Sequence, residues 1–152
     1  MSVRVAMAIA TVFGVGRTPF APGTAGSVVG LLLAAATSTL GPIPQIALAV
    51  LVVAIGAVAA DVAARHHGEP DASWIVVDEV AGMLIAMIGV PFGPLAAVAG
   101  FVLFRLADVY KPFPCRWIDE NVHNGLGTML DDVFAGLWAL AALHAAAWSG
   151  LL

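Results

Sequence analysis

Residues 28–60 read VVGLLLAAATSTLGPIPQIALAVLVVAIGAVAA, and they belong to a longer stretch, from Thr18 to Ala60, that contains no charged side chain. The Gly-Pro-Ile-Pro turn at 41–44 divides this apolar run in two. The pattern predicts a helical hairpin, with one helix over 28–40 and a second over 45–60. An uncharged hairpin of this size is the first indication of a membrane protein.

Two further stretches, 80–104 and 133–152, are also free of charge. The Pro-Phe-Gly-Pro turn at 91–94 divides the first of them, which predicts a second hairpin. Its helices are short, so we expect them to cross the bilayer only with their charged neighbours included, over about 74–90 and 95–111. The last stretch has about the 20 residues that a single crossing needs.

All Lys, Arg, Asp and Glu residues fall into three windows, 4–17, 61–79 and 105–132. A helical hairpin leaves and returns on the same side of a membrane, so the three windows are expected to share one face. The positive-inside rule makes that face cytoplasmic, since it carries all six Lys and Arg residues. The predicted fold is therefore an all-α integral-membrane bundle of about four to five hydrophobic helices, forming a single domain over 1–152.

The composition supports this interpretation. Hydrophobic residues make up 61% of the chain and charged residues 11%, against about 45–50% and about 25% in soluble domains. The alternative is a buried helical bundle in a soluble oligomer. The net charge of −4 argues against binding to nucleic acid. Residues 1–16 resemble a signal peptide, but they run directly into a Gly/Pro-rich motif, so we expect them to be retained.

Four carboxylates lie in two adjacent pairs at the predicted membrane boundary: Asp78, Glu79, Asp131 and Asp132. Acidic groups beside hydrocarbon are costly and usually face a polar site. Paired carboxylates are the ligands that Mg²⁺ prefers, with phosphate and water in the remaining positions. The alternative is that they cap helix N-termini. Segments 77–83 and 130–137 both place such a pair before a glycine, which is either a duplicated metal-binding element or a coincidence.

Basic residues and a glycine-rich segment are candidates for phosphate binding. Arg105, Asp108 and Lys111 are spaced to lie along one helix edge, either as an interfacial salt bridge or as a metal ligand or base beside two phosphate-binding cations. Segment 14–27 (GVGRTPFAPGTAGS) offers backbone N–H groups, the hydroxyls of Thr24 and Ser27, and the Arg17 guanidinium. Its alternative role is a structural turn and helix cap.

The histidines and the single cysteine are weaker candidates. His123 precedes Asp131 in a Gly-rich segment and is a possible acid, base or phosphate contact. His66 and His67 are interpreted as a solvated helix end, and His144 as a packing residue with a backbone partner. Cys115 cannot form an intramolecular disulfide, because it is the only cysteine.

Absent motifs narrow the chemistry. Position 121, six residues after Cys115, is Asn121 rather than the Arg of a Cys-x₅-Arg phosphatase. The sequence also lacks the Asp-x-Asp-x-Thr segment of aspartyl-phosphate enzymes and the Asp-Gly-x-x-Ala-Arg run of CDP-alcohol phosphotransferases. Since no covalent nucleophile is evident, a metal-activated water is the simplest remaining chemistry.

Three blocks of the sequence resemble the signature segments of the phosphatidylglycerophosphatase A family, in the family's order. Residues 18–27 (TPFAPGTAGS) are similar to its Ser-Pro-x-Ala-Pro-Gly-Thr-x-Gly-Ser segment, with Thr18 in place of Ser. Residues 75–83 (IVVDEVAGM) resemble its Ile-Val-x-Asp-Glu-x-x-Gly-Met segment. RLAD, KPFP, NVH and DDVFAG within 105–136 are similar to its long C-terminal signature, with Asn124 at a position where Gly is expected.

The resemblance implies a multi-pass enzyme of the bacterial inner membrane, with its active site facing the cytoplasm. Such an enzyme hydrolyses phosphatidylglycerophosphate, a glycerophospholipid, to phosphatidylglycerol and phosphate with Mg²⁺. The matching positions give these catalytic candidates: Asp78, Glu79, Asp108, Lys111, Asp131 and Asp132, with His123 added from its position. The expected metal ligands are Asp78, Glu79, Asp131 and Asp132. The expected substrate contacts are Arg17, Pro22, Gly23, Thr24, Gly26, Ser27, Arg105 and Lys111.

Three rival functions stay open at this point. The same chemistry could act on another lipid phosphate, such as phosphatidate. A small cation-coupled transporter would use membrane-edge carboxylates to bind its coupling ion, although transporters usually keep polar groups near the middle of the membrane. A non-catalytic scaffold gives no reason for so many paired acids and cations at one interface. The sequence leaves the oligomeric state open.

Overall fold

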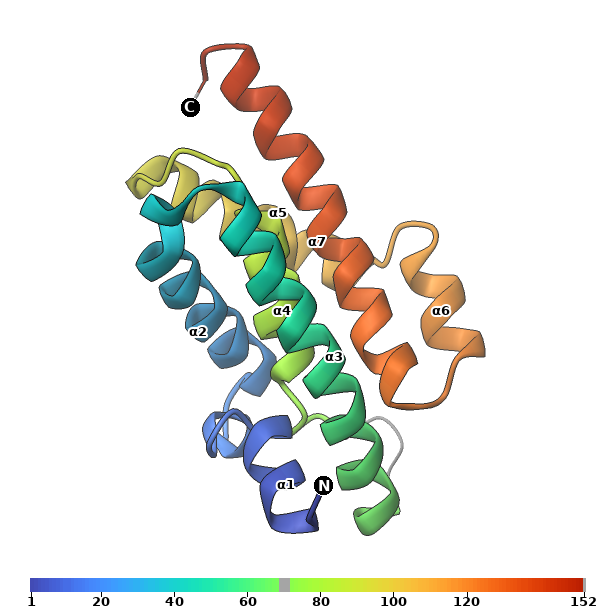
Figure 1. Cartoon of the computed structure of the whole chain (residues 1–152). Helices are drawn as coiled ribbons and strands as arrows, with labels where there is room; N and C mark the ends of the chain where they lie inside the picture. The colour runs from blue at the N-terminus through green and yellow to red at the C-terminus, as the bar shows by residue number, and fades with distance from the viewer. Residues whose placement is uncertain (69–71, 152) are drawn as a thin grey trace.

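The computed structural model describes residues 1–68 and 72–151, and these residues form helices and connecting turns without any strand. The all-α prediction is therefore confirmed (Figure 1). The α-helices are α1 (Val3–Ala10), α2 (Pro22–Thr37), α3 (Pro42–His67), α4 (Val77–Ala86), α5 (Pro94–Tyr110), α6 (Cys115–Asn121) and α7 (Gly125–Trp148). Two single-turn 3₁₀ helices, η1 (Val15–Arg17) and η2 (Ser38–Leu40), complete the described secondary structure.

Three helical segments are long and apolar enough to cross a membrane, namely Pro22–Leu40, Pro42–His67 and Gly125–Trp148. Large apolar side chains such as Leu32, Val50 and Val98 cover the outer surface, and each is more than 60% exposed. A water-soluble protein rarely leaves so much apolar surface uncovered. The lengths, the composition and the exposed apolar surface together are those of a membrane protein.

The predicted hairpin over 28–60 forms, but its helices are longer than expected. Prolines occupy the first turn of α2, α3 and α5, where the missing N–H has no helical partner in any case. Helix α2 therefore begins at Pro22, six residues before the predicted start. Helix α3 continues to His67 and ends at Gly68, whose φ of 75° provides the left-handed cap typical of a helix C-terminus.

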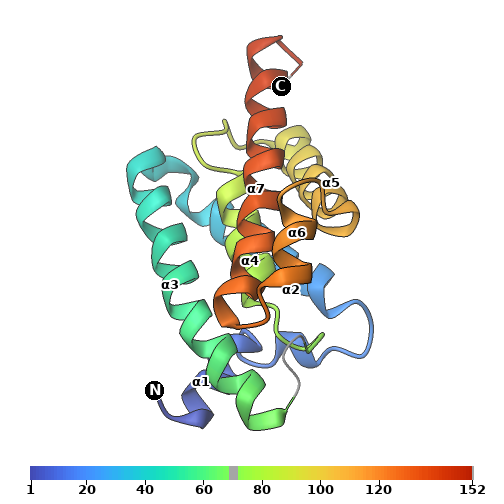
Figure 2. The same cartoon turned by 90° about the vertical axis from the view of Figure 1, so that its right-hand side faces the viewer.

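The short helix α4 is the centre of the molecule. It packs against α2, α3, α5 and α7, and eight of its ten residues are buried. Figure 2 shows it enclosed by the longer helices. The prediction of a crossing helix over 74–90 is wrong, because ten residues extend only about 15 Å and a bilayer core measures about 30 Å.

The turn that ends α4 is stabilised by side chains from other helices. Gly89 has a φ of 67°, and its N–H donates to Gln45 Oε1 at 2.8 Å. His144 Nε2 lies 2.9 Å from the carbonyl oxygen of Ile88, which confirms the predicted backbone partner for His144. These bonds satisfy backbone groups of a partly exposed turn, which would otherwise lie unpaired at the membrane-facing surface.

Glycines allow α4 to approach its neighbours closely. A methyl group at Gly136 of α7 would lie 2.4 Å from the carbonyl oxygen of Gly82 on α4. One at Gly30 of α2 would lie 2.7 Å from Met83 Cβ on α4. Small residues at helix crossings are typical of membrane proteins, where close backbone approach drives association. The site described below depends on the Gly82–Gly136 crossing.

Helix α7 begins at Gly125, eight residues before the predicted start at 133. Asn124 is the N-cap, and its side-chain oxygen accepts hydrogen bonds from the N–H groups of Leu126 and Gly127, both at 3.0 Å. The expectation that Asp131 and Asp132 open this helix is therefore wrong, since no acidic residue lies in its first turn. Segments 77–83 and 130–137 are similar in sequence, but their acidic pairs occupy different positions in the two helices. The first pair lies in the first turn of α4, and the second lies beyond the first turn of α7.

The charged segments gather toward one end of the bundle. The N-terminus, α1, the C-terminal end of α3 and the beginning of α4 lie at the same end in Figure 1, and α6 lies beside the adjoining half of α7. The C-terminal end of α7 lies at the opposite end. This arrangement agrees with the predicted single charged face.

Candidate active site

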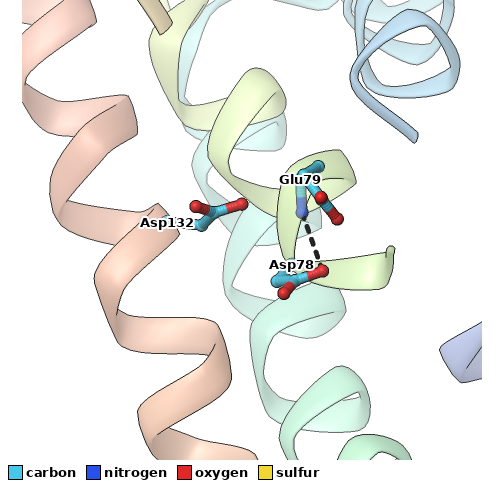
Figure 3. Close-up of side chains that lie close together, drawn as sticks. All are labelled: Asp78, Glu79 and Asp132. Carbon is cyan, nitrogen blue, oxygen red and sulfur yellow. Dashed lines mark hydrogen bonds between the residues drawn. The ribbon is translucent and has the colours of Figure 1, made fainter. Parts of the chain in front are cut away.

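Carboxylates from two helices meet at the α4–α7 crossing. Asp78 and Glu79 lie in the first turn of α4, and Asp132 extends toward them from α7 (Figure 3). One carboxylate oxygen from each of the three side chains lies within 4.8 Å of the other two. We call Asp78, Glu79 and Asp132 the acidic cluster.

The acidic cluster fits a hard divalent cation. Glu79 Oε2, Asp131 Oδ1 and Asp132 Oδ2 are buried, and none has a hydrogen-bond partner within 1–68 and 72–151. A buried, unpaired carboxylate is costly, and neighbouring carboxylates repel one another. A cation among these oxygens relieves both costs. An all-oxygen donor set of this kind is what Mg²⁺ takes, with water and phosphate completing its octahedron.

Asp131, the fourth predicted ligand, lies beside the cluster and has a different partner. Its Oδ2 accepts a hydrogen bond from Lys111 Nζ at 2.9 Å. Lys111 also pairs with Asp119 of α6 at 2.6 Å. Burial opposes the charge on Lys111, but the hydrogen bonds to Asp119 and Asp131 outweigh it, so the pKa of Lys111 is raised and the group stays a cation. Lys111 thereby places one fixed positive charge next to the carboxylates.

The backbone at Lys111 explains how this side chain reaches the site. Lys111 follows the last residue of α5 and has a φ of 47°, a left-handed conformation that costs a bulky residue about 1–2 kcal/mol. Its N–H still closes the helix on the carbonyl oxygen of Ala107 at 2.9 Å. Pro112 prevents any helical continuation. The chain therefore turns sharply at the position where its ammonium group is needed.

A cavity of about 410 Å³ connects these groups. Ten of the sequence-predicted residues line it, namely Pro22, Gly23, Thr24, Asp78, Glu79, Arg105, Asp108, Lys111, Asp131 and Asp132. Arg105 pairs with Asp108 one turn away on α5, as the spacing suggested. The cavity thus has an acidic side made of carboxylates, which suits a cation, and a basic side made of Arg105 and Lys111, which suits an anion.

The first turn of α2 forms another wall of this cavity. A methyl group at Gly23 would lie 2.2 Å from Glu79 Oε1 and 3.3 Å from Arg105 Nη1, so the end of the helix lies close to both side chains. The first N–H groups of a helix have no partner within it and attract anions. The sequence predicts that a loop provides these N–H groups. In the structure, residues 22–27 belong to α2, so the N-terminus of this helix provides them.

Gly26 and Ser27 have structural positions in the same helix. Ser27 is fully buried, and its Oγ donates to the carbonyl oxygen of Gly23 at 2.9 Å. A methyl group at Gly26 would lie 2.8 Å from the carbonyl oxygen of Val76. Neither residue lines the cavity, so the structure does not bring these two predicted substrate contacts to the site.

Arg17 and His123 also lie outside this cavity. Arg17 lines a cavity of about 540 Å³ beside α1. His123 lines one of about 250 Å³ together with Asp61 and Arg65. Conversely, sequence reasoning missed Asp119, which fixes Lys111. The two residues are eight positions apart, and the sharp turn between α5 and α6 brings them together; the sequence has no pattern that predicts this turn.

Cys115 lies near the site as a neutral thiol. It is 1% exposed, and burial, together with the negative charges of Asp131 and Asp132, raises the pKa of its thiol to about 11. A thiol in this state is a poor nucleophile at neutral pH. The structure thus agrees with the motif argument against cysteine catalysis.

Comparison with known proteins gives consistent matches. Residues 8–147 match the family model described as phosphatidylglycerophosphatase A. The phosphatidylglycerophosphatase A of Escherichia coli (strain K12) is 38% identical over 138 residues, covering 90% of this chain and 80% of that protein. The protein of the same name in Haemophilus influenzae is 35% identical over 139 residues, covering 90% and 85%.

A Bacteroides thetaiotaomicron protein, provisionally named a phosphatidylinositol-3-phosphatase, is 38% identical over 148 residues, covering 92% of each chain. All three relatives carry names of lipid phosphatases. No solved structure matches the chain significantly.

Proposed function

Because this chain belongs to the phosphatidylglycerophosphatase A family, we propose that its cavity hydrolyses phosphatidylglycerophosphate to phosphatidylglycerol and inorganic phosphate. The observation that carries this proposal is the cavity itself, in which buried acceptors for a cation face two cations suited to a phosphate. The reaction adds water across the terminal phosphate ester. The ester P–O bond breaks, the oxygen of water bonds to phosphorus, and the glycerol oxygen takes up a proton.

The basic side of the cavity holds the phosphate monoester. Arg105 and Lys111 each have N–H donors beyond those used toward Asp108, Asp119 and Asp131, so both can bind phosphate oxygens without losing these partners. The N-terminus of α2 adds backbone donors and a favourable field at Gly23 and Thr24. Together they neutralise the charge that spreads over the phosphoryl oxygens in the transition state.

We assign the acidic cluster as the site of Mg²⁺, with Asp131 beside it. The ion would supply Lewis-acid polarisation of the phosphoryl group and a lowered pKa for a water molecule. Asp131 is oriented by Lys111 through Oδ2, which leaves its buried Oδ1 to accept the proton of the attacking water. Asp108 orients Arg105 through their ion pair.

The membrane positions the rest of the substrate. Val109 of α5 lines the cavity and is 68% exposed on the outer face of its helix. The apolar surface of α5 continues through Leu106 and Val102, both more than 45% exposed. Acyl chains can therefore stay in the lipid along α5 while the headgroup enters the polar cavity. We place the protein in the bacterial inner membrane, with this cavity toward the cytoplasm.

The test is phosphate release from phosphatidylglycerophosphate in detergent micelles. The wild-type protein is assayed with Mg²⁺ and with EDTA, beside Asp132→Asn and the control Glu120→Gln. Glu120 is an exposed acid paired with Arg116 on α6, so its substitution removes the same charge away from the cavity. We expect EDTA and Asp132→Asn to lower turnover by about 100-fold or more, and Glu120→Gln to leave it unchanged. Turnover of Asp132→Asn within a few-fold of wild type would contradict the metal assignment.

A second candidate is the same hydrolysis on another lipid phosphate, which the Bacteroides relative's name favours. Phosphatidate and a phosphatidylinositol phosphate, assayed under the same conditions, distinguish the two. A higher kcat/KM for either lipid than for phosphatidylglycerophosphate would move the assignment to that substrate. Release from none of them by the folded protein would direct attention to ion transport in liposomes.

A further inference from the structure

A second cavity, of about 540 Å³, lies beside α1 and carries the opposite charge. Its polar walls are Arg4 of α1, Arg17 of η1, and His66 and His67 at the end of α3. No acidic residue of the described chain lines it. Four groups that donate hydrogen bonds therefore converge from three separate elements in a protein whose net charge is −4. We call this space the basic cavity.

Residues 72–75, which lead into α4, border both the basic cavity and the cavity of the acidic cluster. We call the cavity of about 410 Å³ that holds the acidic cluster the acidic cavity, and Ala72, Ser73 and Ile75 line it. Trp74 lies between them in sequence and instead contacts His67, with ring centroids 5.0 Å apart. A methyl group at Gly16 would overlap the carbonyl oxygen of Trp74, at 2.0 Å, so the turn after α1 packs directly on this connection. The two cavities are neighbours with separate walls.

The turn after α1 gives the basic cavity an apolar edge. Val12 and Phe13 have φ values of 49° and 54°, a conformation that bulky residues rarely adopt. Thr11 stabilises the turn, because its Oγ1 donates to the carbonyl oxygen of Met7 and accepts from the N–H of Gly14. The strained turn leaves Phe13 87% exposed at the edge of the cavity. Strain that persists in a well-connected turn often serves a binding site.

We propose that the basic cavity binds the headgroup phosphate of an anionic phospholipid in the membrane leaflet next to the acidic cavity. Guanidinium groups bind phosphate oxygens in pairs of parallel hydrogen bonds, and Arg4 and Arg17 provide two of them. Val3 is 36% exposed and Phe13 is 87% exposed. These two side chains give the acyl chains of a lipid an apolar surface, whereas a free phosphate ion has no use for one. Basic pockets at the cytoplasmic side of membrane proteins typically hold anionic headgroups.

Trp74 provides a local reporter for this proposal. We would reconstitute the full-length protein in phosphatidylcholine vesicles and titrate phosphatidylglycerol or phosphatidylcholine with dibrominated acyl chains, which quench tryptophan on contact. The difference between wild type and Trp74→Phe isolates the quenching of Trp74. We expect brominated phosphatidylglycerol to quench Trp74 at several-fold lower mole fraction than brominated phosphatidylcholine. Soluble glycerol phosphate added at millimolar concentration should leave this preference in place.

Matched variants locate the binding. Arg4→Gln/Arg17→Gln should abolish this several-fold preference, because each basic residue near an anionic surface contributes about 1 kcal/mol, or about fivefold in affinity, and two are lost. Arg4→Lys/Arg17→Lys should retain most of it, which shows that the fold tolerates changes at both positions. Arg116→Gln is the control, because Arg116 is an exposed cation of α6 outside the basic cavity.

Four results would overturn the proposal. Three of them are equal quenching by both lipids in wild type, an unchanged preference in Arg4→Gln/Arg17→Gln, and an equal loss in Arg116→Gln. Displacement of the brominated lipid by soluble glycerol phosphate would assign the cavity to a small phosphate instead, and would equally reject a lipid site. The readout is binding at Trp74, so these outcomes are independent of whether the acidic cavity hydrolyses phosphatidylglycerophosphate.

Discussion

Cys115 illustrates how the surroundings of one side chain decide its chemistry. The residue lies at the start of α6, close to an active-site candidate, and a thiol near a phosphate-binding cation might be taken for a nucleophile. Burial and the adjacent carboxylates favour the neutral form, so its pKa rises to about 11. At pH 8 the folded protein therefore holds almost no thiolate at this position.

This state predicts the reactivity of Cys115. At pH 8 the native protein should react with a disulfide reagent at least about 100-fold more slowly than the protein unfolded in SDS, because only the thiolate reacts. Cys115→Ala should retain phosphatase activity within a few-fold. Rapid labelling of the native protein, or loss of turnover in Cys115→Ala together with normal folding, would show that the thiol takes part in the reaction.

At the residue scale, a site residue can be predicted from the sequence when its charge conflicts with the apolar residues beside it. Asp78, Glu79 and Asp132 border apolar segments, and such acids need a polar function, so their meeting was expected. Arg17 and His123 carry no such conflict. Their place depends on a strained turn after α1, which has no local sequence signal, and on the exact start of α7, whose local signal is the Asn124 cap. The structure puts both in other cavities.

At the scale of elements, the α4–α7 crossing positions the acidic cluster. Gly82 and Gly136 let the two backbones touch, and Asp132 lies one turn before Gly136 on the same helix. Any side chain at the crossing would push α7 away from α4 and draw Asp132 from Asp78 and Glu79. Packing and catalysis are therefore linked through one pair of glycines.

Substituting Gly136 by Ala tests this link. A methyl group there would lie 2.4 Å from the carbonyl oxygen of Gly82, so we expect a loss of about 1–3 kcal/mol in unfolding free energy. We also expect weaker Mg²⁺ dependence, measured as a higher Mg²⁺ concentration for half-maximal turnover. Gly93→Ala is the matched control, because a methyl group at Gly93 has no atom within 4 Å. Equal thermal unfolding midpoints for the two variants would contradict the tight crossing.

The helical hairpins could be predicted from turns and apolar runs, whereas two helix ends could not. The end of α4 depends on Gln45 and His144, which satisfy backbone groups of the following turn from distant parts of the chain. The start of α7 depends on Asn124 as its cap, a signal that lies in the sequence but was hidden among glycines typical of a loop. Tertiary contacts decide the first case, and local capping decides the second.

At the scale of the whole molecule, the distribution of charge predicts an orientation. The N-terminus, α1 and the C-terminal end of α3, which together with the turn after α1 carry three of the six basic residues, lie at one end of the bundle, while the C-terminal end of α7 lies at the other (Figure 1). The positive-inside rule places the basic end in the cytoplasm. With this orientation, we expect both cavities to lie on the cytoplasmic side of the membrane.

Single cysteines report this orientation. In a Cys115→Ala background, Ser149→Cys should be labelled by a membrane-impermeant maleimide on cells whose outer barrier has been opened. Glu120→Cys should be labelled only after the inner membrane is permeabilised. Both positions are exposed in the structure, so access depends on the side of the membrane alone. The reverse labelling pattern would contradict the proposed cytoplasmic site.

The brevity of α4 also affects how the protein is made. Ten residues are too few to span a bilayer core of about 30 Å, so we expect α4 to reach its buried position only together with the helices that enclose it. The enclosing helix α7 follows α4 in the chain and carries Asp132. The acidic cluster is therefore incomplete until α7 has been made and has packed against α4.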